Sequence, residues 1–306
     1  MQSMHSFQLV LPLVLILTGT VRANWVSRYH SGIKMLKSAD VEQARQELTA
    51  ALKEAEANGI RGRELGAIVS ALGRAEFEAG RYRTALKRYN RSVGLLESSP
   101  EEQAAALSNA GSAALALRDS ARAERFFRQA LELSPDNVTV VYLLGRALFL
   151  QRRYTDAESY ERRAIELGDV SDSLSAALAR NELSLIYEAQ NRNAESMELL
   201  NAAISAVPAG RMHAAMIANL GVMEWKLGMK REAAAHLLQS LREAEKAVGP
   251  QHPDVGNVLA FYALVLQKTG EKVLAKEVAA RAAAIRGAFQ AETNSSGATV
   301  DWLDLK

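Results

Sequence analysis

The hydrophobic and polar positions of this chain follow a helical period with regular interruptions. Leu107 is followed by small apolar residues at i+3, i+4 and i+7, which places them on one stripe of a helix. After a turn at residues 118–120, a second stripe consists of Ala123, Phe127 and Ala130. Pro135 ends this stretch, because proline cannot continue a helical hydrogen-bond ladder. The segment therefore predicts two helices that pack against each other.

The same pattern recurs along the chain, with one small residue near the middle of each first helix. These residues are Gly32, Gly73, Gly111, Gly145, Ser184, Gly221 and Ala263. Gly111 and Gly145 are 34 positions apart, and the other intervals are slightly longer. Residues that tolerate a left-handed backbone follow four of the first helices, at Gly80, Asn191, Gly228 and Gly270. The pattern predicts about seven helix-turn-helix units.

Three stretches resemble the tetratricopeptide repeat, with its L-G…G-x-Y-x-x-A…A spacing. Two of them are AIVSALGRAEFEAGRYRTALKRY and VVYLLGRALFLQRRYTDAESYERRAIEL. The last, VGPQHPDVGNVLAFYALVLQKTGEKVLAKEVAARAAAIR, resembles the longer kinesin-light-chain variety. The resemblance covers residues 25 to about 288. It implies an all-α, right-handed α-solenoid of about seven repeats, with a concave face that binds peptides or partner proteins.

Composition agrees with a folded helical protein. The chain has 306 residues, of which 48% are hydrophobic and 24% charged, and it contains six prolines and no cysteine. The absence of cysteine excludes disulfides, zinc ribbons and thiol catalysis. A net charge of +2, with both signs interspersed, does not indicate nucleic-acid binding.

The first segment resembles an export signal. An apolar run over residues 7–17 precedes Val21-Arg22-Ala23, which fits a signal-peptidase site with cleavage before Asn24. We expect a signal peptide at 1–23, a repeat solenoid at 24–290 and a flexible tail at 291–306, in a periplasmic or secreted protein. Because the first residues contain no Lys or Arg, an uncleaved membrane anchor stays open as the alternative.

Candidate binding residues lie off the packing stripe of the first helices, one or two positions from each small residue, and further candidates surround them on the same surface. Asn109 and Asn219 both stand two positions before a glycine, and the resemblance implies that such amides hold a ligand backbone. The other candidates are Arg74, Phe77, Tyr142, Arg146, Phe149, Trp225, Lys226 and Phe261. Arginines there would pair with acidic groups, and aromatics would act as anchors or complete the packing between repeats.

No motif of catalysis or metal binding is present. The chain lacks a P-loop, a dinucleotide glycine fingerprint, HExxH and G-x-S-x-G, and its histidines are not at ligand spacing. We predict no enzyme activity and no cofactor. The alternatives are a structural or self-assembling solenoid and a membrane-tethered envelope-biogenesis factor. The tail carries Asp301-Trp302, which resembles peptides that kinesin-light-chain repeats accept, so we hypothesise that it occupies the groove of its own chain or a neighbour's.

Overall fold

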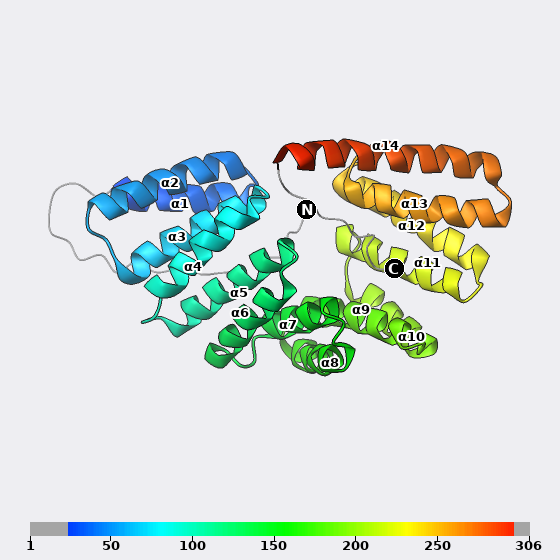
Figure 1. The fold of residues 1–306 in the computed structure, drawn as a ribbon, viewed down its shortest axis with the longest axis horizontal. Coiled ribbons are helices and arrows are strands. Elements are labelled where there is room, and N and C mark those ends of the chain that lie inside the picture. The colour runs from blue at the N-terminus through cyan, green and yellow to red at the C-terminus, as the bar shows by residue number, and fades with distance from the viewer. Residues whose placement is uncertain (1–23, 297–306) are drawn as a thin grey trace. The chain divides into compact units, whose positions relative to one another are not determined.

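The computed structural model describes residues 24–296, apart from the side chains of residue 171 and of residues 289–296. The predicted signal segment at 1–23 and the Asp301-Trp302 motif lie outside the described residues. Within 24–296 the chain forms fourteen α-helices and no β-strand (Figure 1). The predicted all-α fold is therefore confirmed.

The chain divides into two compact units, one ending at Arg153 and the other beginning at Tyr154. The described helices of the N-terminal unit are α1 (Asn24–Lys37), α2 (Val41–Ala57), α3 (Gly62–Glu78), α4 (Tyr82–Leu95), α5 (Pro100–Ala116), α6 (Ser120–Leu133) and α7 (Val138–Leu150). Those of the C-terminal unit are α8 (Tyr154–Ser171), α9 (Ser173–Ala189), α10 (Asn193–Ala206), α11 (Arg211–Lys226), α12 (Lys230–Val248), α13 (Pro253–Thr269) and α14 (Lys272–Ser296).

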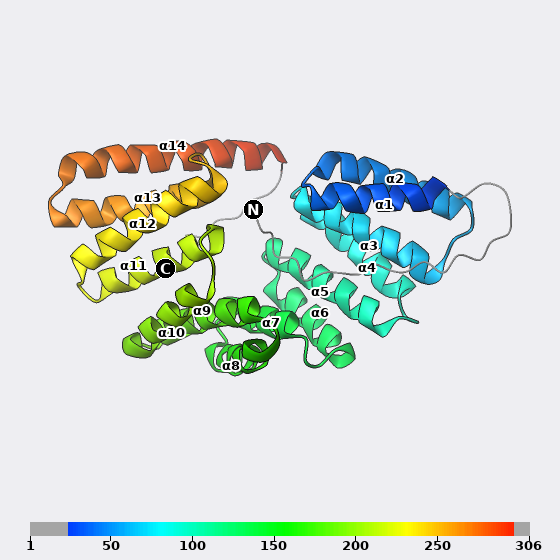
Figure 2. The ribbon, with the colours of Figure 1, turned by 180° about the vertical axis from the view of Figure 1, so that it is seen from behind.

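Helices within each unit pack in the order of the sequence. The pairs α1–α2, α3–α4 and α5–α6 form in the N-terminal unit, and α9–α10, α11–α12 and α13–α14 in the C-terminal unit (Figures 1 and 2). Each second helix also contacts the first helix of the next repeat, as α4 contacts α5. First helices of adjacent repeats also touch, as α3 touches α5 and α11 touches α13. Each unit is therefore a row of repeats in which the first helices share one face.

The small residues of the first helices are the points of closest approach. A methyl group on Gly73 would lie 2.9 Å from the Tyr89 ring, and one on Gly221 would lie 2.9 Å from Leu237 Cγ. Gly111 faces the fully buried Phe127 in the same way, and Gly32 faces Leu48. In all four pairs the large residue stands sixteen positions after the glycine. The glycines are needed for space, because a Cβ would overlap the neighbouring helix.

Repeat four departs from this rule. Its glycine is Gly145, and sixteen positions later stands Glu161 rather than a large apolar residue. Glu161 is nevertheless 0% exposed on α8. The sequence pattern alone would have assigned this carboxylate to the surface, because buried carboxylates are rare.

One backbone geometry closes the turn inside every repeat. The predicted left-handed residues Gly80, Asn191, Gly228 and Gly270 all have φ between 62° and 99°. In each turn the next residue donates its N–H to the carbonyl five positions earlier, as Arg81 does to Glu76 at 2.8 Å. This bond satisfies one of the last carbonyls of the first helix. Three turns use non-glycine residues that the sequence did not reveal, namely Ala39, Arg118 and Arg152, each with φ 60°.

The C-terminal end differs from the predicted boundary. Helix α14 continues to Ser296, so residues 291–296, which the sequence analysis assigned to the tail, are helical. Ala288, Gln290, Ala291 and Glu292 are good helix formers, which favours continuation of the helix through these residues. No helix in the described part of the chain is long and apolar enough to span a membrane.

We predict that Gly111→Ala destabilises the N-terminal unit by about 1–3 kcal/mol, because the added methyl group overlaps the Phe127 ring. Adding Phe127→Leu should restore part of this loss. Gly94→Ala is the matched control: Gly94 lies in α4 with no atom near the place that a methyl group would take, so this variant should gain about 0.5–1 kcal/mol. Urea denaturation followed by circular dichroism measures all three, and a Gly111→Ala protein as stable as wild type would contradict the packing argument.

Candidate functional site

In the C-terminal unit, polar side chains connect the first helices across repeats. Asn219 Nδ2 on α11 donates a hydrogen bond to Asn181 Oδ1 on α9 at 2.9 Å. Seven positions further along both helices, Lys226 forms an ion pair with Glu188. At the other end of α11, Arg211 Nε lies 2.7 Å from Asp254 Oδ2 on α13. These contacts fix the face shared by α9, α11 and α13, which we call the first-helix face.

Side chains on this face change in character along each helix. About one helical turn after each asparagine stands an apolar residue. On α9 it is Leu185 and on α11 it is Val222, and both are half-buried. On α13, Leu264 is 40% exposed. The first-helix face thus presents amides, then apolar side chains, then charges.

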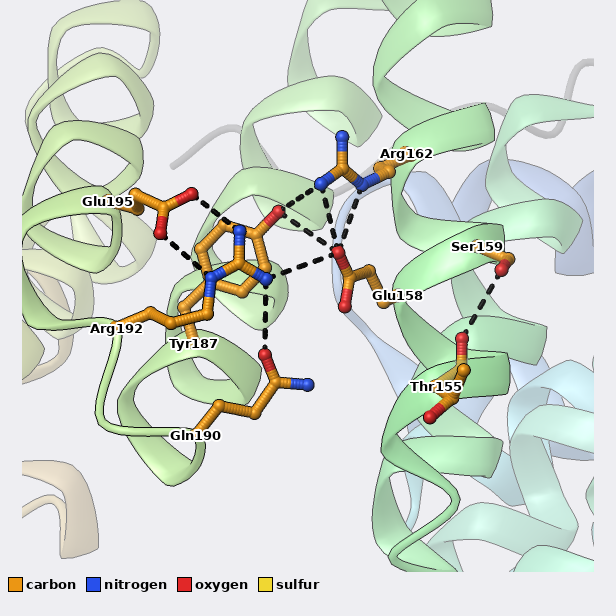
Figure 3. Close-up of polar contacts among 8 residues, drawn as sticks. All are labelled: Thr155, Glu158, Ser159, Arg162, Tyr187, Gln190, Arg192 and Glu195. Carbon is orange, nitrogen blue, oxygen red and sulfur yellow. Dashed lines mark hydrogen bonds and ion pairs between the residues drawn. The ribbon is translucent and has the colours of Figure 1, made fainter.

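A polar network connects α9 to α8, the helix that precedes it (Figure 3). Arg162 Nη2 on α8 donates to the Tyr187 hydroxyl at 2.6 Å and to Glu158 Oε1 at 2.9 Å. The Tyr187 hydroxyl in turn donates to Glu158 Oε1 at 3.2 Å. Arg192 stacks its guanidinium 3.6 Å from the centre of the Tyr187 ring and is held by Glu195. Figure 3 shows that Tyr187 lies between the two arginines.

The charges of this network balance one another. Burial alone would raise the pKa of Glu158, but hydrogen bonds from Arg162 and Tyr187 outweigh it and hold that pKa below its usual value. Burial, together with the neighbouring Glu158 charge, raises the pKa of Tyr187. Glu158 is therefore ionised and Tyr187 protonated at neutral pH. The network joins repeats four and five and leaves no charge for an external ligand.

A second network of the same kind lies in the N-terminal unit. Glu124 on α6 accepts from Gln151 at 2.8 Å and from Arg153 at 2.8 Å. The order Gln-x-Arg recurs at Gln190 and Arg192, where Arg192 reaches Glu158. In both cases a glutamate near the start of a second helix receives hydrogen bonds from the turn of the following repeat. The recurring Gln-x-Arg triplet is the sequence signal that could have revealed these networks.

The candidates on α3 and α5 of the N-terminal unit form no hydrogen bond to one another among the described residues. Arg74 is paired with Glu78 on its own helix at 2.7 Å. Asn109 is half-buried on α5, and its side chain forms no hydrogen bond among the described residues. Phe77 packs edge-on against Tyr82 at 5.2 Å between ring centres, and contacts the core between repeats two and three. Phe77 is half-buried and takes part in the packing between repeats, which is one of the two roles expected for the aromatic candidates.

Two aromatic candidates on α7 are buried, which corrects their predicted place on the binding surface. Tyr142 is 3% exposed and Phe149 is 8% exposed. Arg146 is half-buried, and its Nη1 donates to the Tyr142 hydroxyl at 3.2 Å. Counting positions from Gly145 located the correct helix but not which side chains are covered, since burial depends on neighbouring helices.

The remaining candidates lie in the C-terminal unit. Trp225 and Phe261 are half-buried against the core formed by α11 to α14. Asn219 and Lys226 take part in the contacts that order the first-helix face. Their partners Asn181 and Glu188 were missed, because Asn181 stands three rather than two positions before its small residue, Ser184. Among the described residues no three His, Asp or Glu side chains are grouped as metal ligands.

Comparison with protein families and solved structures identifies the repeat. Tetratricopeptide repeat family models match residues 70–137 and 108–172, and another matches residues 213–254. No curated protein sequence matches the chain.

Several solved structures share the fold at low identity. A tetratricopeptide repeat protein from Parabacteroides merdae has a TM-score of 0.59 and 19% identity, over 85% of this chain and 98% of that one. PilW, described as a widely conserved type IV pilus biogenesis factor, has a TM-score of 0.58 and 18% identity, over 73% and 94%. TPR-like repeats of a putative kinesin light chain from Podospora anserina have a TM-score of 0.50 and 17% identity, over 62% and 97%.

The helix pairs, their close approach at small residues and their common turn define an α-solenoid of helix-turn-helix repeats. The chain is a tetratricopeptide repeat protein. The predicted resemblance to this family, including its kinesin-light-chain members, is confirmed. Proteins with this fold commonly mediate protein–protein interactions.

We predict that Glu158→Gln lowers the free energy of unfolding by about 2 kcal/mol at neutral pH, because two arginines and Tyr187 lose a charged acceptor. The folded-state pKa of Glu158 is depressed, so its contribution is present above the usual glutamate pKa and is lost as pH falls through the folded value. The variant should therefore lose less stability on acidification than wild type.

Thermal denaturation from pH 7 down to about pH 2 measures both effects, because the folded-state pKa of Glu158 lies below the usual glutamate value. Glu166→Gln is the control, because Glu166 is exposed on the same helix. Equal melting temperatures and equal acid sensitivity for the two variants would show that the network does not stabilise the fold.

Proposed function

We propose that this protein is an exported interaction scaffold that binds a peptide segment of a partner protein on the first-helix face of its C-terminal unit. The proposed role is binding without catalysis. The observation that carries it is the Asn181–Asn219 amide pair, which joins α9 to α11 on that face.

The amide pair leaves hydrogen-bonding groups unused. The contact occupies one N–H of Asn219 and one lone pair of Asn181. Neither side chain makes another hydrogen bond among the described residues, so the Asn219 oxygen and the Asn181 amino group remain available. A peptide group offers one acceptor and one donor, and it can satisfy both amides whatever its side chain. If the N and O atoms of both side-chain amides were exchanged, one amino group and one oxygen of the pair would still be available.

The neighbouring side chains indicate what kind of segment fits. Leu185, Val222 and Leu264 follow the amides along their helices and offer apolar surface. Beyond them Glu188 neutralises Lys226, whereas Lys268 on α13 is exposed and has no ion pair among the described residues. An extended segment with apolar side chains and one acidic group matches this order.

We expect a random peptide library selected on the full chain to enrich segments that combine apolar residues with one acid. The double variant Asn181→Ala, Asn219→Ala should bind the selected peptide about ten- to thirtyfold more weakly, because two backbone hydrogen bonds of about 1 kcal/mol each are lost. Isothermal titration calorimetry measures the affinities.

Two matched controls locate the effect. Asn201→Ala changes an exposed asparagine on α10, and Asn109→Ala changes the half-buried asparagine on α5; neither should weaken binding. A loss of affinity with Asn109→Ala, but not with the double variant, would move the site to the N-terminal unit. Failure of the library to enrich any segment would count against peptide binding itself.

Export is the second part of the proposal. Its support is the apolar segment that precedes Val21-Arg22-Ala23. The likeness to PilW, described as a type IV pilus biogenesis factor, favours a second candidate function as an envelope-assembly factor. In that role the partner segment would belong to an envelope protein.

We expect the protein isolated from its own host to begin at Asn24. Intact-mass spectrometry of the purified protein measures the amino terminus, and fractionation of the cells measures its compartment. A protein that retains residues 1–23 in the membrane fraction would support the anchored alternative, and one that retains them in the cytoplasm would contradict export.

A further inference from the structure

The second helices of repeats two and three carry an unusual concentration of positive charge. Five cationic side chains on α4 and α6 have no ion pair or hydrogen bond to an acidic side chain among the described residues. We call these the α4–α6 basic face: Arg83, Lys87, Arg88, Arg122 and Arg125. None of these five residues belongs to the first-helix face.

Helix α4 differs from the mixed-charge helices of the chain. It contains four cationic residues and no acidic residue, whereas α12 and α14 mix both signs. Cations elsewhere on α4 and α6 are neutralised: Arg91 by Glu56, and Arg128 by Glu124 at 2.7 Å. The positive charge of the α4–α6 basic face is therefore not balanced by the fold.

Three of the five charges, Arg83, Lys87 and Arg125, are exposed, and Arg88 and Arg122 are half-buried. Ala85, Leu86 and Tyr89 form the buried stripe of α4. Arg83 and Lys87 fall on the opposite side of the helix and are exposed.

On α6, the side that faces α4 carries the aromatic ring of Phe126. Phe126 packs against the core that contains Ala85 and Leu86 of α4. The Arg122 guanidinium lies 5.7 Å from the centre of the Phe126 ring, which orients it. Arg122, Arg125, Phe126 and Gln129 line a shallow recess. The recess has room for one anionic group beside two guanidinium groups.

We infer that the α4–α6 basic face docks on an anionic phospholipid surface. Guanidinium groups bind phosphate oxygens with two parallel hydrogen bonds, and four of the five cations are arginines. Charges spread over two adjacent helices match a plane of headgroups, with one headgroup phosphate in the α6 recess.

An acidic protein partner fits this surface less well. Protein interfaces depend on buried aromatic or aliphatic anchors. No large hydrophobic side chain of α4 is exposed, and on α6 the only exposed one within its described length is Leu133 at the helix end. Binding to the α4–α6 basic face is therefore electrostatic.

Vesicle co-sedimentation of the full chain tests the inference. The probes are vesicles of phosphatidylcholine alone and of phosphatidylcholine with phosphatidylglycerol. Any contribution of residues 1–23 through apolar insertion is common to all variants. We expect the chain to prefer the anionic vesicles, and Arg83→Gln, Lys87→Gln, Arg125→Gln to weaken that binding on the order of a hundredfold, at about fivefold per cation.

The matched control removes the same charge elsewhere. Arg231, Arg242 and Lys246 on α12 are exposed and lack an ion pair among the described residues, so their replacement by Gln should weaken binding only a few-fold. Glutamine is a good helix former, and circular dichroism should show equal melting temperatures for both triple variants.

Four results would overturn the inference. They are equal binding to neutral and anionic vesicles, equal losses in the two triple variants, displacement from vesicles by inorganic phosphate at constant ionic strength, and tighter binding to soluble poly-glutamate than to vesicles. The third would identify free phosphate as the ligand, and the fourth an acidic protein segment.

Discussion

The fold depends on a contact that recurs in four repeats, between a glycine of the first helix and a large side chain sixteen positions later. Gly73 with Tyr89, and Gly111 with Phe127, bring two helix backbones so close that a single methyl group would not fit. Because side chains of one helix then fill the space beside the other, most of the apolar surface of each repeat is buried within the repeat or against the next one. The stacking of successive repeats follows when this contact recurs along the chain.

The turn inside each repeat fixes the direction in which the second helix leaves. The same hydrogen bond, from the residue after the left-handed position to a carbonyl five residues earlier, forms whether that position is Gly80 or Arg152. A non-glycine residue there costs about 1 kcal/mol or more, and the surrounding packing tolerates it. The Glu124 and Glu158 networks then tie such turns to the preceding second helix. Turn and network together orient the first helices and hence the side chains of the first-helix face.

The two proposed surfaces are physically independent. The first-helix face uses half-buried amides and apolar side chains, and it depends on contacts between first helices such as Asn181 with Asn219. The α4–α6 basic face uses charged side chains of second helices, of which Arg83, Lys87 and Arg125 are exposed, and it needs no such contact. A solenoid can carry both, because each helix buries only one side and presents the rest to solvent.

Patterns in the sequence were sufficient to predict the class of fold, the first-helix glycines and four of the seven left-handed turn residues, because helical period, small residues and turn chemistry are local properties. They also indicated Asn219 and Lys226, but they could not supply the partners of these residues. The packing of distant helices determines that Asn219 meets Asn181, that Tyr142 and Phe149 are buried, and that Glu161 occupies an interior position. Burial and pairing of these side chains depend on helices far away in the sequence, whose relative placement no local pattern specifies.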